Sequence, residues 1–151
     1  MNKAIEAALF LHLLGVAVWI GGMVFAHFCL RPAAAGLLEP PARLPLLVAT
    51  FDRFFRYTAY AVAIILASGI AMFIQSGTRS APLGWHVMAA LGLAMTLVFA
   101  YVYGVLYPKL RQHCDGAAWP AAAATLNGIR RLVAVNLVLA ACTVAAAALS
   151  R

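Results

Sequence analysis

The chain has 151 residues, of which 66% are hydrophobic and 10% are charged, and its formal net charge is +7. Soluble domains are about 45–50% apolar and about 25% charged, so this composition excludes an ordinary soluble domain and indicates an integral membrane protein. In so apolar a chain the positive charge favours a lipid bilayer, and not a nucleic acid, as the partner.

Four apolar segments predict an all-α fold, an integral membrane antiparallel four-helix bundle that forms one transmembrane domain over residues 1–151. A run of ~20 apolar residues at ~1.5 Å rise per residue crosses the ~30 Å hydrocarbon core of a bilayer. The segments show no alternation of the kind that strands show. We expect helices at about 4–27, 57–75, 83–107 and 129–149.

The segments between these helices contain prolines and polar residues. The first helix is expected to end before the Arg31-Pro32 pair and the third before Pro108, because proline disrupts the interior of a helix. Residues 33–52 are predicted to form a loop, with the Glu-Pro-Pro run at 39–41 as its clearest breaker. Residues 109–120 are predicted to form a second, polar loop.

Small residues recur along the first helix at the spacing that lets two helices approach closely. The pattern is Ala17-x3-Gly21 followed by Gly22-x3-Ala26. Lipid supplies no hydrophobic drive between helices, so close packing through small residues is typical of membrane bundles. The pattern predicts a packing face on this helix.

Lysine and arginine are distributed unequally between the two sides of the predicted bundle. Eight of the 11 lie in the two long connections or at the helix ends beside them, namely Arg31, Arg43, Arg53, Arg56, Lys109, Arg111, Arg130 and Arg131. The opposite side has Lys3, Arg79 and Arg151. By the positive-inside rule we expect a bacterial inner (plasma) membrane protein with the long loops in the cytoplasm and both termini in the periplasm.

His12 is a polar ring inside a charge-free run that extends from Ala7 to Ala26. An ionisable residue within a membrane helix is costly and is by default a candidate functional site. Helices one and three run in the same direction, and the helical rise puts His12 ~12 Å and His86 ~5 Å into them. The two imidazoles are therefore predicted at similar depth, where two facing histidines suit the axial ligation of haem iron or part of a copper site.

The neighbours of the two histidines favour haem b. Trp19 shares the face of His12, Gly15 and Gly22 flank it, and Trp85 precedes His86. Aromatic residues beside glycines predict a smooth slot for a flat macrocycle held between helices one and three. The first interpretation is thus a b-type haem protein in electron transfer or haem handling.

Copper is the alternative, because Met72 near the outer end of the second helix would fall level with the imidazoles. His12, His86 and Met72 form a soft ligand set suited to Cu(I). A third interpretation is a cofactor-free membrane assembly subunit, in which the histidines hydrogen-bond neighbouring helices. No hydrolase, kinase or nucleotide-binding motif is present, so an enzymatic role would be that of a haem-dependent membrane oxidoreductase.

The expected cytoplasmic side carries Asn136 inside the fourth helix and basic residues around it. Two interpretations stay open there: ordinary membrane anchoring, with Asn136 hydrogen-bonding across the bundle, or a patch that recognises a lipid headgroup or a quinone. His27 and His113 lie on this side, and the sequence assigns neither a role. A redox partner and a second copy of the chain are further open partners.

Several short motifs are spread along the chain, namely Leu11-His12-Leu13-Leu14-Gly15, Val18-Trp19-Ile20-Gly21-Gly22-Met23, Leu30-Arg31-Pro32, Arg53-Phe54-Phe55-Arg56, His86-Val87-Met88, Tyr107-Pro108-Lys109-Leu110 and Ile129-Arg130-Arg131-Leu132-Val133-x-Val135-Asn136-Leu137. Together they resemble the CopD-like family of bacterial inner-membrane proteins, above all its short four-helix members. The resemblance implies copper uptake or tolerance. In size and helix count the chain is also similar to membrane haem proteins, including oxygen-independent protoporphyrinogen oxidases. Their helix-borne lysine has no equivalent here, since Lys109 follows Pro108 at a predicted helix end.

Overall fold

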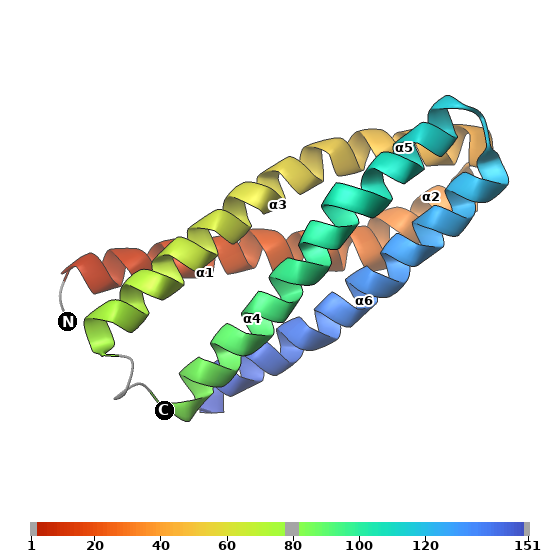
Figure 1. Ribbon diagram of the computed structural model, residues 1–151. Helices are drawn as coiled ribbons and strands as arrows, with labels where there is room; N and C mark the ends of the chain where they lie inside the picture. Colours follow the sequence, from red (N-terminus) through yellow and green to blue (C-terminus); the bar gives the residue numbers. More distant parts are fainter. Residues whose placement is uncertain (1–2, 78–81, 150–151) are drawn as a thin grey trace.

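The computed structural model describes residues 3–77 and 82–149, which form four long antiparallel helices (Figure 1). The first is continuous through α1 (Lys3–Val24), η1 (Phe25–Leu30) and α2 (Arg31–Leu37), and the second is α3 (Pro40–Ser76). The third runs through α4 (Leu83–Tyr101), η2 (Val102–Leu106) and α5 (Tyr107–Asp115), and the fourth is α6 (Trp119–Leu149). The described ranges contain helices and no strand, so the predicted all-α four-helix bundle is confirmed.

The bundle has two ends that differ in chemistry (Figure 1). We call the end where α1 begins and α6 ends the terminal end. The opposite end, with α2, α5 and the starts of α3 and α6, is the basic end, because it holds eight of the 11 lysine and arginine residues. Figure 1 shows the terminal end at the lower left and the basic end at the upper right.

Each helix is longer than the sequence predicts, and the first and third continue through prolines that were expected to stop them. The expected ends before Pro32 and Pro108 are wrong, since α2 and α5 extend the first and third helices to Leu37 and Asp115. The four predicted ranges lie inside these longer helices, each toward the terminal end of the bundle, and the added residues extend the helices at the basic end.

The wide π-helical turns η1 and η2 explain how the two prolines are accommodated. In η1 the backbone N–H of Arg31 donates to the Ala26 carbonyl, and in η2 that of Tyr107 donates to the Val102 carbonyl. Both bonds reach back five residues instead of four, and each turn is followed directly by a residue that precedes a proline. A proline ring clashes with the carbonyl four residues earlier in an α-helix, and the wider turn moves that carbonyl aside.

The predicted loop at 33–52 is also wrong, because its prolines start a helix instead of breaking one. Glu39 has an extended conformation, and Pro40 and Pro41 occupy the first turn of α3. Proline is tolerated there, since the first backbone N–H groups of a helix have no partner within it. In the same way α6 begins at Trp119, with Pro120 next to it, so the expected connection at 109–120 shrinks to a turn at 116–118.

The helices pack as two pairs, α1 with α3 and α4 with α6 (Figure 1). The larger apolar core joins α3, η2, α5 and α6 at the basic end and contains Leu44, Leu47, Phe51, Phe55, Val102, Tyr107, Leu110, Ala122, Leu126 and Ile129. A smaller core near the middle of the bundle contains Trp19, Met23, Ala61, Val62, Met95 and Ala140. Large apolar side chains of the terminal half, such as Phe10, Ile74 and Leu97, are 64–71% exposed.

This distribution fits a bilayer around the terminal half. All four helices are long and apolar enough to cross a membrane, with 31–37 residues each. Such helices measure roughly 46–56 Å, whereas a hydrocarbon core is about 30 Å thick, so one end projects beyond it. Tyr57 and Tyr60, 68% and 69% exposed, lie directly after Arg53 and Arg56 and suit the aromatic belt at a membrane boundary. The helices are therefore long enough to extend beyond the hydrocarbon core at the basic end.

Candidate functional site

His12 is half-buried on α1 and faces α3. Its Nδ1 lies 3.1 Å from the carbonyl oxygen of Ile65 and 3.1 Å from the hydroxyl oxygen of Ser68. A carbonyl can only accept, so Nδ1 carries the hydrogen and donates it. The Ser68 hydroxyl donates its own proton to the Ile64 carbonyl at 2.6 Å and can accept from the imidazole. In the neutral ring the lone pair is then on Nε2.

Glycines let α1 and α3 approach closely around this contact. A Cβ at Gly69 would lie 3.5 Å from Cε1 of His12, and one at Gly15 would lie 2.8 Å from Cγ1 of Ile65. A Cβ at Gly22 would overlap the ring of Phe54. The space beside Gly15 and Gly22, where the sequence predicts a slot for a flat macrocycle, is therefore filled by side chains of α3.

His86 lies in the first turn of α4 with an exposed side chain. Its Nδ1 lies 3.3 Å from the carbonyl oxygen of Pro82, so it too donates through Nδ1 and keeps the lone pair of its neutral ring on Nε2. The ring meets Phe73 of α3 edge-on, with centroids 5.5 Å apart, and Trp85 meets the same phenylalanine at 5.9 Å.

The three predicted copper ligands, from α1, α3 and α4, are all found at one stretch of α3. His12 contacts residues 65–69, Met72 follows Ser68 by one helical turn and is 8% exposed, and His86 contacts Phe73. Over residues 3–77 and 82–149 the structure shows no hydrogen bond or ring contact between the two imidazoles. The same residues include no group of three or more His, Cys, Asp or Glu side chains that could hold a metal ion.

Trp19, the remaining predicted site residue on α1, belongs to the middle core. Its ring is 4% exposed and meets Phe99 of α4 edge-on at 6.0 Å. It also lines a small cavity with Thr58 and Asn136. The Asn136 side chain donates from Nδ2 to the Met95 carbonyl at 3.2 Å, which is the hydrogen bond across the bundle that the anchoring interpretation expects.

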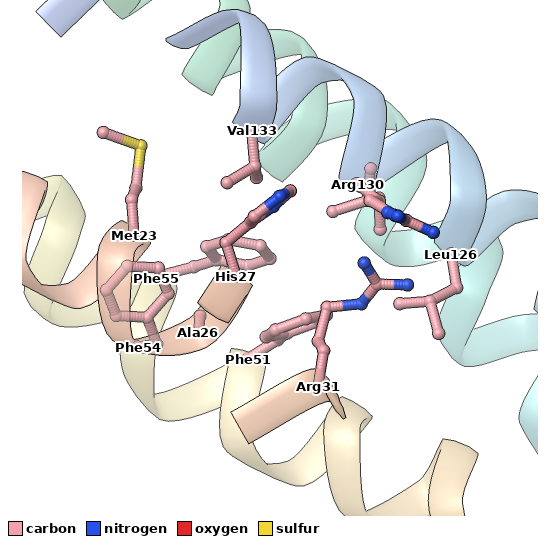
Figure 2. Close-up of a pocket in the computed structure, with 11 residues that line it drawn as sticks. Met23, Ala26, His27, Arg31, Phe51, Phe54, Phe55, Leu126, Arg130 and Val133 are labelled. Atoms are coloured by element: carbon pink, nitrogen blue, oxygen red, sulfur yellow. The ribbon is translucent and has the colours of Figure 1, made fainter. Parts of the chain in front are cut away.

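A second cavity at the basic end brings His27 together with two of the basic residues that the sequence places on this side of the bundle. His27 of η1, Arg31 of α2 and Arg130 of α6 line it, and Figure 2 shows the two guanidinium groups beside one another near the imidazole. The indication of this cluster in the sequence was that His27 and Arg31 are four residues apart. The position of Arg130 opposite them depends on helix packing and could not be derived from the sequence. His113 lies apart from this cavity, near the end of α5.

The fold and the four apolar helices define a multi-pass membrane protein. A family profile described as copper resistance protein D matches residues 48–150, more than half of the chain, so the chain belongs to this family. The match confirms the resemblance seen in the sequence motifs, and it includes Met72 and His86, whereas His12 precedes it. Comparisons with curated proteins and with solved structures found no match.

Proposed function

We propose that the protein binds Cu(I) at the terminal end of the bundle as a step in copper uptake or tolerance. The family membership supports a relation to copper. The observation that carries the proposal is the hydrogen bond from Nδ1 of His12 to the Ile65 carbonyl, 3.1 Å long, which leaves the Nε2 lone pair free. Histidines that bind metals typically donate their other N–H to a carbonyl or carboxylate in this way.

The neighbouring donors suit a soft metal ion. Met72 supplies a thioether one turn from Ser68 on the same face of α3, and its flexible side chain can reach toward α1. His86 lies next to Phe73, the residue that follows Met72 on α3, and the lone pair of its own Nε2 is free. Imidazole and thioether ligands favour Cu(I) over hard cations. In this proposal copper is the cargo, and the three side chains hold it.

The packing of α3 favours copper over haem. A haem between helices one and three needs open space along α1, but Ile65 and Phe54 of α3 occupy the positions beside Gly15 and Gly22. A single metal ion needs only that two or three donor atoms converge. Haem b and its electron-transfer role therefore stay predictions, and the same purified protein tests them.

The first experiment measures copper retention. Protein purified in neutral detergent is loaded with Cu(I) under reducing conditions, desalted and analysed for metal, and we expect about one copper per chain. His12→Ala should lose most of it, and Met72→Leu should weaken retention against a chromophoric Cu(I) chelator by about ten-fold, the effect of ~1.4 kcal/mol.

The matched control is His113→Ala, which removes an imidazole from α5 at the opposite end and should retain the wild-type amount of copper. Equal helical content by circular dichroism shows that each variant is folded. Wild-type retention in His12→Ala would contradict the proposal. A Soret band that sharpens with dithionite, and disappears in His12→Ala, would replace copper with haem.

A further inference from the structure

The cavity at the basic end contains three basic side chains that we call the basic cluster: His27, Arg31 and Arg130 (Figure 2). Figure 2 shows the guanidinium groups of Arg31 and Arg130 next to one another, with the imidazole of His27 close to them. Arg43 is within electrostatic range of Arg31 as well. These like charges repel one another at short range, and the basic cluster itself contains no negative charge that offsets the repulsion.

The polar atoms of the cluster are buried without partners. Nδ1 of His27 and Nε of Arg31 are both shielded from solvent and make no hydrogen bond. In the described ranges the single ion pair joins Asp52 to Arg56 at 2.7 Å, and the other oxygen of Asp52 accepts from Tyr107. That carboxylate is therefore already used elsewhere. Nε of Arg31 is a charged donor, and leaving such a donor buried and unpaired is costly, so a missing acceptor is expected here.

The walls of the cavity are apolar, which restricts the chemistry of the acceptor. They are formed mainly by Met23, Phe51, Phe54, Phe55, Ile129 and Val133. The cavity lies where α3 passes from its arginines into the apolar segment that begins at Tyr57, and we expect lipid headgroups at this level. Cations above an apolar surface at that level suit an anion that carries a hydrocarbon chain.

The π-helical turn η1 helps to assemble the cluster. Met23, His27 and Arg31 are spaced four residues apart and all line the cavity. In a regular α-helix residues at this spacing drift steadily around the axis, and one wide turn offsets part of that drift. The turn before Pro32 thus keeps His27 and Arg31 on one face of the helix, toward Arg130.

A water molecule alone does not compensate the positive charges of the basic cluster. The free space in the cavity is ≈ 20 Å³, enough for a single water that could bridge His27 and Arg31. Water satisfies hydrogen bonds but leaves the repulsion between Arg31 and Arg130 in place. Arg130 is exposed, so an anion can approach at the cavity mouth and place one oxygen inside. Arginine is well suited to phosphate oxygens because it can donate two parallel hydrogen bonds.

We propose that the basic cluster binds the phosphate of an anionic phospholipid, with His27, Arg31 and Arg130 as the donors. The site is at the opposite end of the bundle from the proposed copper ligands and does not depend on them. Bound lipid would neutralise the cluster and join η1 and α2 to α6 through a shared ligand.

The test titrates phosphatidylglycerol into protein purified in neutral detergent and follows the midpoint of thermal unfolding, with phosphatidylcholine as the uncharged comparison. We expect phosphatidylglycerol to raise the midpoint in the wild type, and Arg31→Gln and Arg130→Gln to weaken the apparent affinity about ten-fold or more. Without lipid, Arg31→Gln should unfold no earlier than the wild type, because it removes a partly buried cation whose Nε has no hydrogen-bond partner. Arg130→Gln changes an exposed side chain and keeps the test valid if Arg31→Gln does not fold.

The matched control is Arg131→Gln, which removes the same charge from the next residue of α6, outside the cavity. It should retain the wild-type response. A loss in Arg131→Gln as large as that in Arg130→Gln would overturn the site in favour of a diffuse basic surface. An equal shift with inorganic phosphate alone would overturn the assignment to lipid, and equal shifts with both lipids would overturn the requirement for an anion.

Discussion

Three glycines of α1 differ in what lies beside them, although they occur within eight residues of one another. A methyl group added at Gly15 would meet Ile65 and the backbone of Ala61, and one added at Gly22 would meet the ring of Phe54. At Gly21 the added methyl group would have nothing within 4 Å. Gly15 and Gly22 therefore allow the close approach of α3, while Gly21 has no such role in the described structure.

We expect Gly22→Ala to lower the stability of the protein and Gly21→Ala to leave it unchanged or raise it. The new methyl group at position 22 overlaps Phe54, and overpacking of this kind costs about 1–3 kcal/mol. At position 21 the methyl group meets open space, and alanine is the better helix former by up to about 1 kcal/mol. Thermal unfolding in one detergent compares the two, and equal effects would contradict the different roles of the two glycines.

The sequence singled out residues of α1 that lie against α3, but not all of their partners. A lone imidazole in an apolar run singled out His12, and the glycine spacing singled out Gly15 and Gly22. Their interpretation as a macrocycle slot depended on which helix faces them, and that is set by helix packing. Ser68, the hydroxyl partner of His12, could not be recognised, because serine within an apolar helix commonly bonds its own backbone, as Ser68 also does.

At the level of elements, prolines are the main source of error in the predicted boundaries. Apolar runs predicted four helices, and four are present in the described ranges. The rule that proline ends a helix failed at Pro32 and Pro108, because a π-helical turn precedes each of them, and it failed at 39–41, because those prolines start α3. Local sequence gives the position of a proline but not the width of the turn before it.

The contact between α3 and α5 at the basic end includes a buried tyrosine. The hydroxyl of Tyr107, a residue that is 6% exposed, donates to Asp52 at 3.1 Å, and Asp52 also pairs with Arg56. Tyr107→Phe should destabilise the protein by about 0.5–1.5 kcal/mol, since it removes one hydrogen bond and keeps the ring. Tyr57→Phe, at a residue that is 68% exposed, is the control and should have little effect on the unfolding midpoint.

The molecule as a whole divides into a lipid-facing half and a half with a buried core. Apolar side chains of the terminal half are exposed because lipid solvates them, and association there depends on close packing and hydrogen bonds. At the basic end, burial of leucine and phenylalanine side chains stabilises the larger core. The proposed copper ligands lie in the first half and the basic cluster in the second.

The distribution of charge predicts how this molecule is oriented in the membrane. With eight of the 11 lysines and arginines at the basic end, that end is expected in the cytoplasm and the terminal end in the periplasm. Alkaline phosphatase fused after α6 should then be active, because that enzyme matures only in the periplasm, and green fluorescent protein at the same position should be dark. Inserted in the turn at 116–118, the two reporters should give the opposite pattern. This orientation would let the copper ligands meet ions from outside the cell, while the basic cluster meets the anionic inner leaflet. The reverse pattern at both positions would contradict the orientation and move copper entry to the cytoplasmic side.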